Sequence, residues 1–205
     1  SKLNFKTKEM YKELSEKIKL KLEKHHELYR FPCKAEQWED IFDQIINSSK
    51  SNWIGGGHSV GADVISENNK VFTKNTRIQN KSGELDFKKG TVKWNGHRTT
   101  KYKNLDDKLN FISSNHYDYY AMLSRDKKDW KNGNKIYYLI IFKSSKIDYS
   151  LLDWSEKYGK TNTLTGWRGI GNPNFSAEIN KSMSDQLWTT SKLDYLGETY
   201  KIHIK

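Results

Sequence analysis

The 205-residue sequence contains little cysteine, little proline and no long apolar segment. Cys33 is its one cysteine, which excludes an internal disulfide framework and a cysteine-rich zinc site and fits a reducing, cytoplasmic setting. No apolar stretch approaches the ~18 residues that a bilayer crossing requires, and the first residues lack the charged and apolar regions of a signal peptide. We therefore expect no membrane-spanning segment and no membrane partner.

Acidic residues are also scarcer than basic ones. The chain has 25 Asp and Glu against 36 Lys and Arg, for a net charge of +11. Residues 70–103 hold 10 basic and 2 acidic side chains, whereas residues 31–69 hold 2 and 6. Like charges that lie this close repel one another unless a polyanion covers them. Nucleic acid is the obvious polyanion, and the 7 Trp, 12 Tyr and 8 Phe offer surfaces for its bases. A Lys-rich surface without any such partner is the alternative.

Apolar spacing predicts an α/β fold. A long amphipathic helix is expected over 8–29, with Tyr11, Leu14, Ile18 and Leu22 on one face. The other expected elements are helices at 35–47 and 104–113, strands at 61–66, 76–82, 92–94, 117–123, 136–142 and 200–204, and loops at 48–61 and 166–174. The uninterrupted apolar run at 136–142 is typical of a strand covered on both faces. We predict one domain over 1–205, with a central mixed β-sheet flanked by helices and an N-terminal helical segment at 1–30.

Four polar residues could carry chemistry. Asp63 enters a strand after the glycine-rich segment 55–61, and Gln79 and Lys81 lie on one face of the next strand because side chains alternate along a strand. Pairing of the two strands would bring Asp63 beside Gln79 and Lys81, and Glu39 lies at the margin of the buried face of its helix. Oxygen ligands suit Mg²⁺, so we expect Asp63 and Gln79 to be metal ligands and Glu39 to complete the set or orient the metal-bound water. Lys81 is expected to hold or activate that water and to neutralise developing negative charge. The alternative is that Asp63 caps a turn and Lys81 is solvated.

Asp63 followed by Gln79-Asn80-Lys81 resembles the active-site signature of the PD-(D/E)xK nuclease superfamily, over about residues 36–143. Within it, the chain is most similar to a type II restriction endonuclease. The resemblance implies a restriction-endonuclease-like core and Mg²⁺-dependent, sequence-specific cleavage of double-stranded DNA by a metal-activated water. It also implies a homodimer, because a palindrome is cut by two sites related by a two-fold axis.

The chain departs from the family pattern at two positions. Ala62 stands where the signature name has proline, and Gln79 stands where Asp or Glu is usual. A neutral amide oxygen should bind a metal more weakly than a carboxylate does. Glu67 and Glu84 are therefore alternatives for the second metal ligand.

Two segments carry candidate DNA contacts. In the first, His97, Arg98, Lys101 and Lys103 could meet phosphates, and His97 could instead act as a general base. The second is a DNA-recognition region at about 150–192, because Arg pairs well with guanine and Asn with adenine. Its candidates are Lys160, Trp167, Arg168, Asn172 and Asn174. An ordinary surface loop with a packed Trp167 is the alternative for the glycine-rich part.

Two other function classes remain open. A non-catalytic nucleic-acid-binding module would use the same basic and aromatic residues without a metal. A cysteine hydrolase would pair Cys33 with His58 or His97, but no recognisable motif surrounds Cys33. The sequence favours the endonuclease over both.

Overall fold

The computed structural model describes residues 3–47, 62–114 and 116–205. Its α-helices are α1 (Phe5–Leu28), α2 (Ala35–Ile46), α3 (Leu105–Ser113), α4 (Lys127–Lys131) and α5 (Leu193–Leu196). Its strands are β1 (Val64–Ile65), β2 (Arg77–Asp86), β3 (Thr91–Arg98), β4 (Tyr119–Asp126), β5 (Lys135–Lys143), β6 (Asp153–Tyr158), β7 (Leu164–Ile170), β8 (Phe175–Asn180), β9 (Gln186–Lys192) and β10 (Tyr200–Ile204). The predicted loop at 48–61, including His58, and the start of the strand predicted at 61–66 lie outside the described residues.

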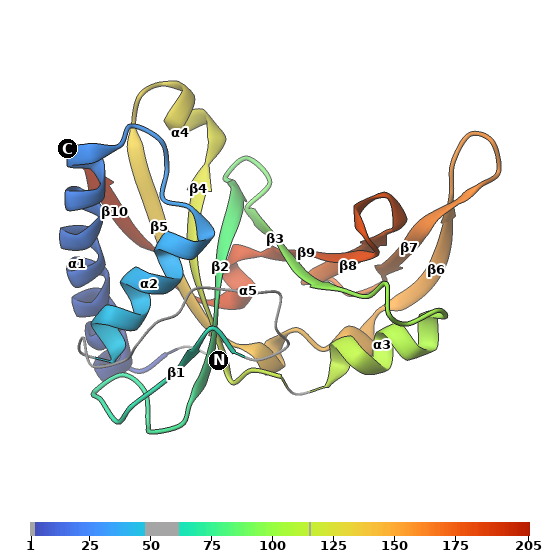
Figure 1. Ribbon diagram of the computed structural model, residues 1–205, viewed down its shortest axis with the longest axis horizontal. Helices are drawn as coiled ribbons and strands as arrows, with labels where there is room; N and C mark the ends of the chain where they lie inside the picture. Colours follow the sequence, from blue (N-terminus) through green and yellow to red (C-terminus); the bar gives the residue numbers. More distant parts are fainter. Residues whose placement is uncertain (1–2, 48–61, 115) are drawn as a thin grey trace.

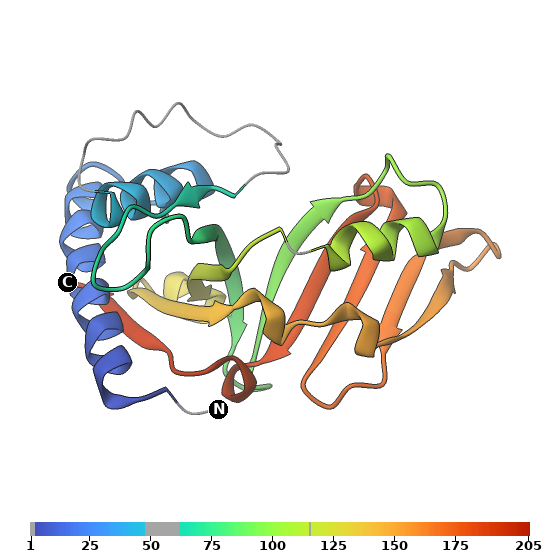
Figure 2. The ribbon, with the colours of Figure 1, turned by 90° about the horizontal axis from the view of Figure 1, so that it is seen from below.

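The strands form one mixed sheet. Its order is β10-β5-β4-β2-β3-β9-β8-β7-β6, and β1 pairs with β2. Strands β2 and β4 run parallel, and the other pairs in the described part of the chain are antiparallel. Helices α1 and α2 lie at one end of the molecule and α3 lies at the other, beside the strands β6–β9 (Figures 1 and 2). The predicted α/β class, with a large mixed sheet flanked by helices, is confirmed.

Both faces of the sheet carry a hydrophobic core. On β5, Tyr137, Leu139 and Ile141 pack with α1 and α2, whereas Ile140 and Phe142 belong to the core on the opposite face. The prediction that this strand is covered on both sides is confirmed. The apolar stripe of α1 is buried in the first core, so it covers the sheet. Among the described helices, none combines the length and apolarity that crossing a bilayer requires.

Strands β2 and β3 separate after a short hairpin. They pair only where Glu84–Asp86 of β2 faces Thr91–Lys93 of β3. Beyond these residues β3 pairs with β9, while β2 pairs with β4 and, at its start, with β1. The edge of β2 that bears residues 79–83 therefore faces an open fork between the two halves of the sheet, which Figure 1 shows as the divergence of β2 and β3.

The second half of the sheet, which consists of β3 and β6–β9, differs from the sequence prediction. Asn95-Gly96 does not close a turn, because β3 continues to Arg98 with an irregular register against β9 between Asn95 and Arg98. Most of the segment predicted as a loop at 166–174 is strand β7. Gly166 of this strand has a φ of 155°, which side chains rarely allow. A Cβ at this position would also collide with the carbonyl oxygen of Ile179 on β8, so the position requires glycine.

Candidate active site

Asp63 is held against the open edge of β2. Val64 of β1 pairs with Ile78 of β2, and the carboxylate of Asp63 accepts a hydrogen bond of 2.9 Å from the backbone N–H of Asn80. The short β1 strand does not extend to this point, so a side-chain oxygen replaces the strand partner that this N–H would otherwise lack. The pairing expected from the sequence is therefore present, and it fixes Asp63 beside the strand that carries Gln79 and Lys81.

Three charged side chains, from α2, β2 and the residue before β1, share this end of the fork. The pKa of Glu39 on α2 is raised to about 7, first by burial and then by the charge of Asp63, while Lys81 opposes the shift. Burial lowers the pKa of Lys81, and the carboxylates of Asp63 and Glu39 counteract that effect. The pKa of Asp63 is raised by burial, against the Asn80 hydrogen bond and the charge of Lys81. The three groups are close enough for each charge to act on the others.

Gln79 places an unpaired oxygen on the same face of β2 as Lys81. Its side chain is 9% exposed, and its Oε1 atom has no hydrogen-bond partner in the described part of the chain. A buried polar atom without a partner costs roughly 1–3 kcal/mol, so it calls for an explanation. The atom fits the role of an oxygen ligand for a hard cation such as Mg²⁺.

The donor set is small for a metal site. Within the described ranges, no group of three or more His, Cys, Asp or Glu side chains is arranged to hold a metal ion. Asp63 and Glu39 supply two carboxylates, and Gln79 adds one neutral oxygen. Mg²⁺ commonly keeps several waters and takes its remaining ligands from substrate phosphates, so a set of this size suits a cation that arrives with DNA.

Glu67 and Glu84 are not placed to replace Gln79. Glu84 lies on the opposite face of β2 and forms an exposed ion pair of 3.8 Å with Lys127. Glu67 is exposed beyond the end of β1, farther from Gln79, and its backbone N–H binds Asn47. The additional acid near Asp63 is Glu39.

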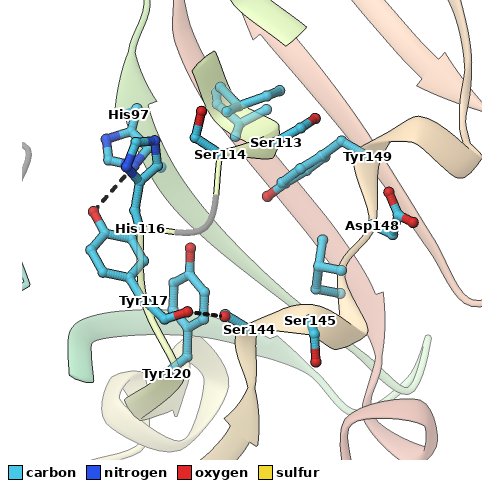
Figure 3. Close-up of a pocket in the computed structure, with 14 residues that line it drawn as sticks. His97, Ser113, Ser114, His116, Tyr117, Tyr120, Ser144, Ser145, Asp148 and Tyr149 are labelled. Atoms are coloured by element: carbon cyan, nitrogen blue, oxygen red, sulfur yellow. Dashed lines mark hydrogen bonds between the residues drawn. The ribbon is translucent and has the colours of Figure 1, made fainter. Parts of the chain in front are cut away.

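A cavity of about 320 Å³, shown in Figure 3, lies beside β2, because its lining residue Tyr120 on β4 is the register partner of Gln79. The Nε2 atom of His97 lies 3.1 Å from the hydroxyl of Tyr117, and the two rings are stacked. Burial lowers the pKa of His97 to about 4, with further contributions from His116 and Lys81. Burial also raises the pKa values of Tyr117 and Tyr120, and the charge of Asp63 adds to both shifts. The cavity is therefore electrostatically coupled to the carboxylates and the lysine.

These pKa shifts bear on His97, which the sequence offered as a phosphate contact or a general base. A pKa of about 4 keeps the imidazole neutral at neutral pH, so His97 contributes no positive charge toward a phosphate. Sequence reasoning did not select Tyr117, Tyr120 or His116 for this site. The available signal was the dense aromatic run 116–120 directly before and within β4.

Several predicted phosphate contacts lie at one end of the second half of the sheet. Arg98 ends β3 opposite Gln186 of β9, and Lys101 and Lys103 follow in an exposed segment. The hydroxyls of Thr99 and Thr100 fasten this segment to the carbonyl oxygens of Asp185 and Ser184, each at 2.7 Å. Lys160 is exposed in the turn between β6 and β7, at the same end of the strands. This end of β3 corresponds to the open end of the fork.

The candidates for base reading are more scattered. Asn172 and Asn174 lie in the turn at the other end of β7, a strand that spans about 20 Å. The Oδ1 atom of Asn172 accepts the backbone N–H of Asn174 at 2.8 Å, so it already has a structural partner. Arg168 on β7 is half exposed and lies 3.6 Å from Glu178. Their contacts with DNA stay predictions.

Trp167 is buried in the protein and is not exposed at the surface. Its side chain is 6% exposed in the second core, and the ammonium groups of Lys108 and Lys181 lie over its ring at 5.3 and 5.9 Å. This burial favours the alternative in which Trp167 is a packed residue over a direct contact with a base. Cys33 is buried too, and burial raises its pKa to about 12, which keeps the thiol protonated.

Lys108 is a structural residue that the sequence analysis did not single out. Its side chain is 1% exposed, and its Nζ atom donates to the carbonyl oxygens of Thr99 (2.8 Å) and Tyr102 (2.6 Å) and to the carboxylate of Asp185 (2.8 Å). One buried ammonium thus ties α3 to the exposed basic segment and to the turn before β9. Its position between Leu105 and Ile112 at helical spacing was the available signal.

We find no similar protein from which a role could be transferred. No protein-family model matches the chain, and no curated protein or solved structure matches it significantly.

Proposed function

We propose that this chain is a Mg²⁺-dependent, sequence-specific endonuclease for double-stranded DNA that acts in the cytoplasm, as a type II restriction endonuclease would. The observation that supports the proposal is the hydrogen bond of Asp63 to Asn80, between Gln79 and Lys81 on β2, together with the electrostatic coupling of Asp63, Lys81 and Glu39. Two carboxylates, an unpaired amide oxygen and a lysine together suit the hydrolysis of a phosphodiester.

Each residue has a distinct task in this proposal. Asp63 and Gln79 would hold Mg²⁺, which supplies positive charge against the phosphate oxygens and lowers the pKa of a water. The ammonium of Lys81 would neutralise the negative charge that develops on the phosphate during attack. Glu39, with a pKa of about 7, would be partly ionised at neutral pH and able to accept the proton that the attacking water loses.

The basic end of the second half of the sheet would hold the DNA backbone. Arg98, Lys101, Lys103 and Lys160 are exposed there, and none of them forms an ion pair within the described residues. Contacts of this type position a protein on DNA without reading its sequence. A homodimer would supply the two catalytic sites that a palindromic target requires. Because the apolar stripe of α1 covers the sheet, the dimer contact would use another surface.

The small donor set also favours a second function, a nucleic-acid-binding module without catalysis. Such a module would use the same basic end and would not need the carboxylates. The two functions differ in what Asp63→Ala does. Loss of cutting with retained DNA binding supports the endonuclease, whereas DNA binding without any cutting by the unmodified protein supports the module.

The experiment that tests the proposal is incubation of supercoiled plasmid DNA with the protein in Mg²⁺ or in EDTA, resolved on a gel. We expect discrete fragments in Mg²⁺ and intact plasmid in EDTA. A smear would contradict sequence specificity, and intact plasmid in both lanes would contradict the endonuclease. Sedimentation of the protein on a cleavable duplex would test the dimer, and a strict monomer would contradict it.

A further inference from the structure

The cavity beside the proposed catalytic residues has its own chemistry. Figure 3 shows His97 and Tyr117 on one side of it and Tyr149 and Asp148 on the other. The lining comes from β3, the end of α3, β4 and the residues just before it, the segments after β5, and β9, so residues distant in sequence form one enclosure.

We propose that this cavity binds a single nucleobase that carries an exocyclic amino group, displaced from the duplex beside the scissile phosphate. The inference rests on the proposed function, since it assigns the cavity to the nucleotide that the same site cleaves.

The position of the cavity is the first support. Lys81 contributes to the pKa of His97, and Asp63 contributes to the pKa values of Tyr117 and Tyr120, so the aromatic wall lies within electrostatic reach of the catalytic groups. Tyr120 of the lining is also the register partner of Gln79, so a phosphate held near Asp63 and Gln79 would lie on the strand next to this wall.

The size and walls are the second support. A volume of about 320 Å³ is at the lower end of the ~300–1,000 Å³ found for small-molecule sites, which suits one base rather than a base pair. The stacked rings of His97 and Tyr117, at a centroid separation of 5.7 Å, form one wall, and Ile112, Ile147 and Leu187 add apolar surface. Enzymes that extrude a base hold it by stacking against aromatic and apolar side chains and by hydrogen bonds to its edge.

The charge of the lining is the third support. Among the described lining residues, Asp148 is the sole Asp or Glu, and none is Lys or Arg. A phosphate would be repelled there, whereas a neutral base would be accepted. The Oδ1 atom of Asp148 accepts hydrogen bonds from the backbone N–H and the hydroxyl of Ser150, which leaves its other oxygen for an amino group. Adenine, cytosine and guanine carry such a group, and thymine does not.

The test uses the intact protein without metal and four probes: deoxyadenosine, deoxycytidine, deoxyguanosine and thymidine. Saturation-transfer NMR should show contact with the base protons of at least one amino-bearing nucleoside, at least about tenfold tighter binding than thymidine, and no contact with deoxyribose 5-phosphate. Ser113→Trp should fill the cavity and reduce binding at least tenfold, because Ser113 is an exposed residue of the lining. Ser155→Trp, on exposed β6 outside the cavity, is the matched control and should bind normally.

The inference is overturned if no amino-bearing nucleoside contacts the protein, if thymidine binds equally well, or if Ser113→Trp binds as tightly as Ser155→Trp. Asp63→Asn should retain nucleoside binding while losing cleavage. Nucleoside binding by a protein that never cuts DNA would contradict the proposed function alone, whereas cutting without nucleoside binding would contradict the base site alone. In a duplex that is cut, the fluorescence of 2-aminopurine beside the cut should change on binding of the unmodified protein and not of Ser113→Trp, and constant fluorescence would contradict displacement.

Discussion

The carboxylate of Asp63 accepts the backbone N–H of Asn80 at 2.9 Å, on the strand edge that β3 leaves unpaired. This hydrogen bond joins an acid outside the strands to the strand that carries Gln79 and Lys81. It also satisfies a backbone donor that would otherwise lack a partner, so one side chain serves both the fold and the proposed chemistry.

Asp63→Asn separates these two roles. The amide oxygen of asparagine can still accept the Asn80 hydrogen bond, but the negative charge for a cation is lost. We expect cleavage to fall by roughly 100-fold or more, the size of effect seen when one charge-stabilising group is removed, with the melting temperature nearly unchanged. Asp106→Asn, at the exposed start of α3, is the control and should cleave normally. Equal cleavage by both variants would remove Asp63 from the site.

The cleavage rate should depend on pH through the ionisation of Glu39. Because its pKa is about 7, the carboxylate form that accepts a proton accumulates as the pH rises through that value. We expect the rate to increase about tenfold per pH unit below pH 7 and to level off above it. Glu39→Gln should be slower and should lack this inflection. A wild-type profile that is flat between pH 6 and 8 would contradict the role of Glu39.

The raised pKa of Glu39 also predicts how the stability of the metal-free protein depends on pH. Its contribution to stability falls as the pH rises, whereas the cleavage rate increases. Glu39 binds its proton more tightly in the folded chain than in the unfolded chain, so between about pH 4.5 and pH 7 the folded state holds more protons. Stability contributed by this group is present at low pH and is lost as the pH rises through that window. Thermal melts should show Glu39→Gln gaining stability relative to the wild type from pH 4.5 to 7.5, and a constant difference would contradict the raised pKa.

Replacing Lys108 on α3 should destabilise the protein more than replacing an exposed lysine nearby. Lys108→Met leaves the carboxylate of Asp185 and two carbonyl oxygens without their buried donor. Removing one partner of a buried ion pair costs about 3–5 kcal/mol, which urea unfolding can measure. Lys103→Met, in the exposed segment that Lys108 anchors, should change the unfolding free energy by less than about 0.5 kcal/mol. Similar losses for both would refute the anchoring role.

The basic end should govern the salt dependence of DNA binding. Each phosphate contact contributes about 0.9 to the slope of log K against log salt, so Lys101→Ala/Lys103→Ala should lower that slope by about 2. Lys12→Ala/Lys24→Ala removes the same charge from exposed positions on α1, away from the fork, and should leave the slope unchanged. Identical slopes for the two double variants would indicate that binding follows net charge rather than this surface.

The first half of the fold could be predicted from the sequence because its apolar periodicity is strong. The spacing that placed α1, α2 and β5 reflects burial on defined faces, and the alternation along β2 correctly placed Gln79 and Lys81 together. The approach of Asp63 followed from strand pairing.

The second half was harder to predict because its strands bury one face and expose the other with few aliphatic residues. The edge strand β6 has no fully buried residue, and β7 is rich in glycine. At Asn95-Gly96 the local turn preference is overridden by the ladder with β9, which keeps β3 extended. The cavity is lined by β3, α3, β4, β9 and the segments after β5, and periodicity within one segment cannot reveal that these elements meet.

The central claim, that the residues at the fork carry out metal-dependent hydrolysis of DNA, is tested most directly by Lys81→Met. Cleavage of plasmid DNA in Mg²⁺ would be measured beside binding of the same DNA, with Lys201→Met on the distant strand β10 as the matched control. We predict that Lys81→Met loses at least about 100-fold in cleavage rate while binding DNA normally, and that Lys201→Met retains both activities. Cleavage by Lys81→Met at the rate of Lys201→Met would contradict the account.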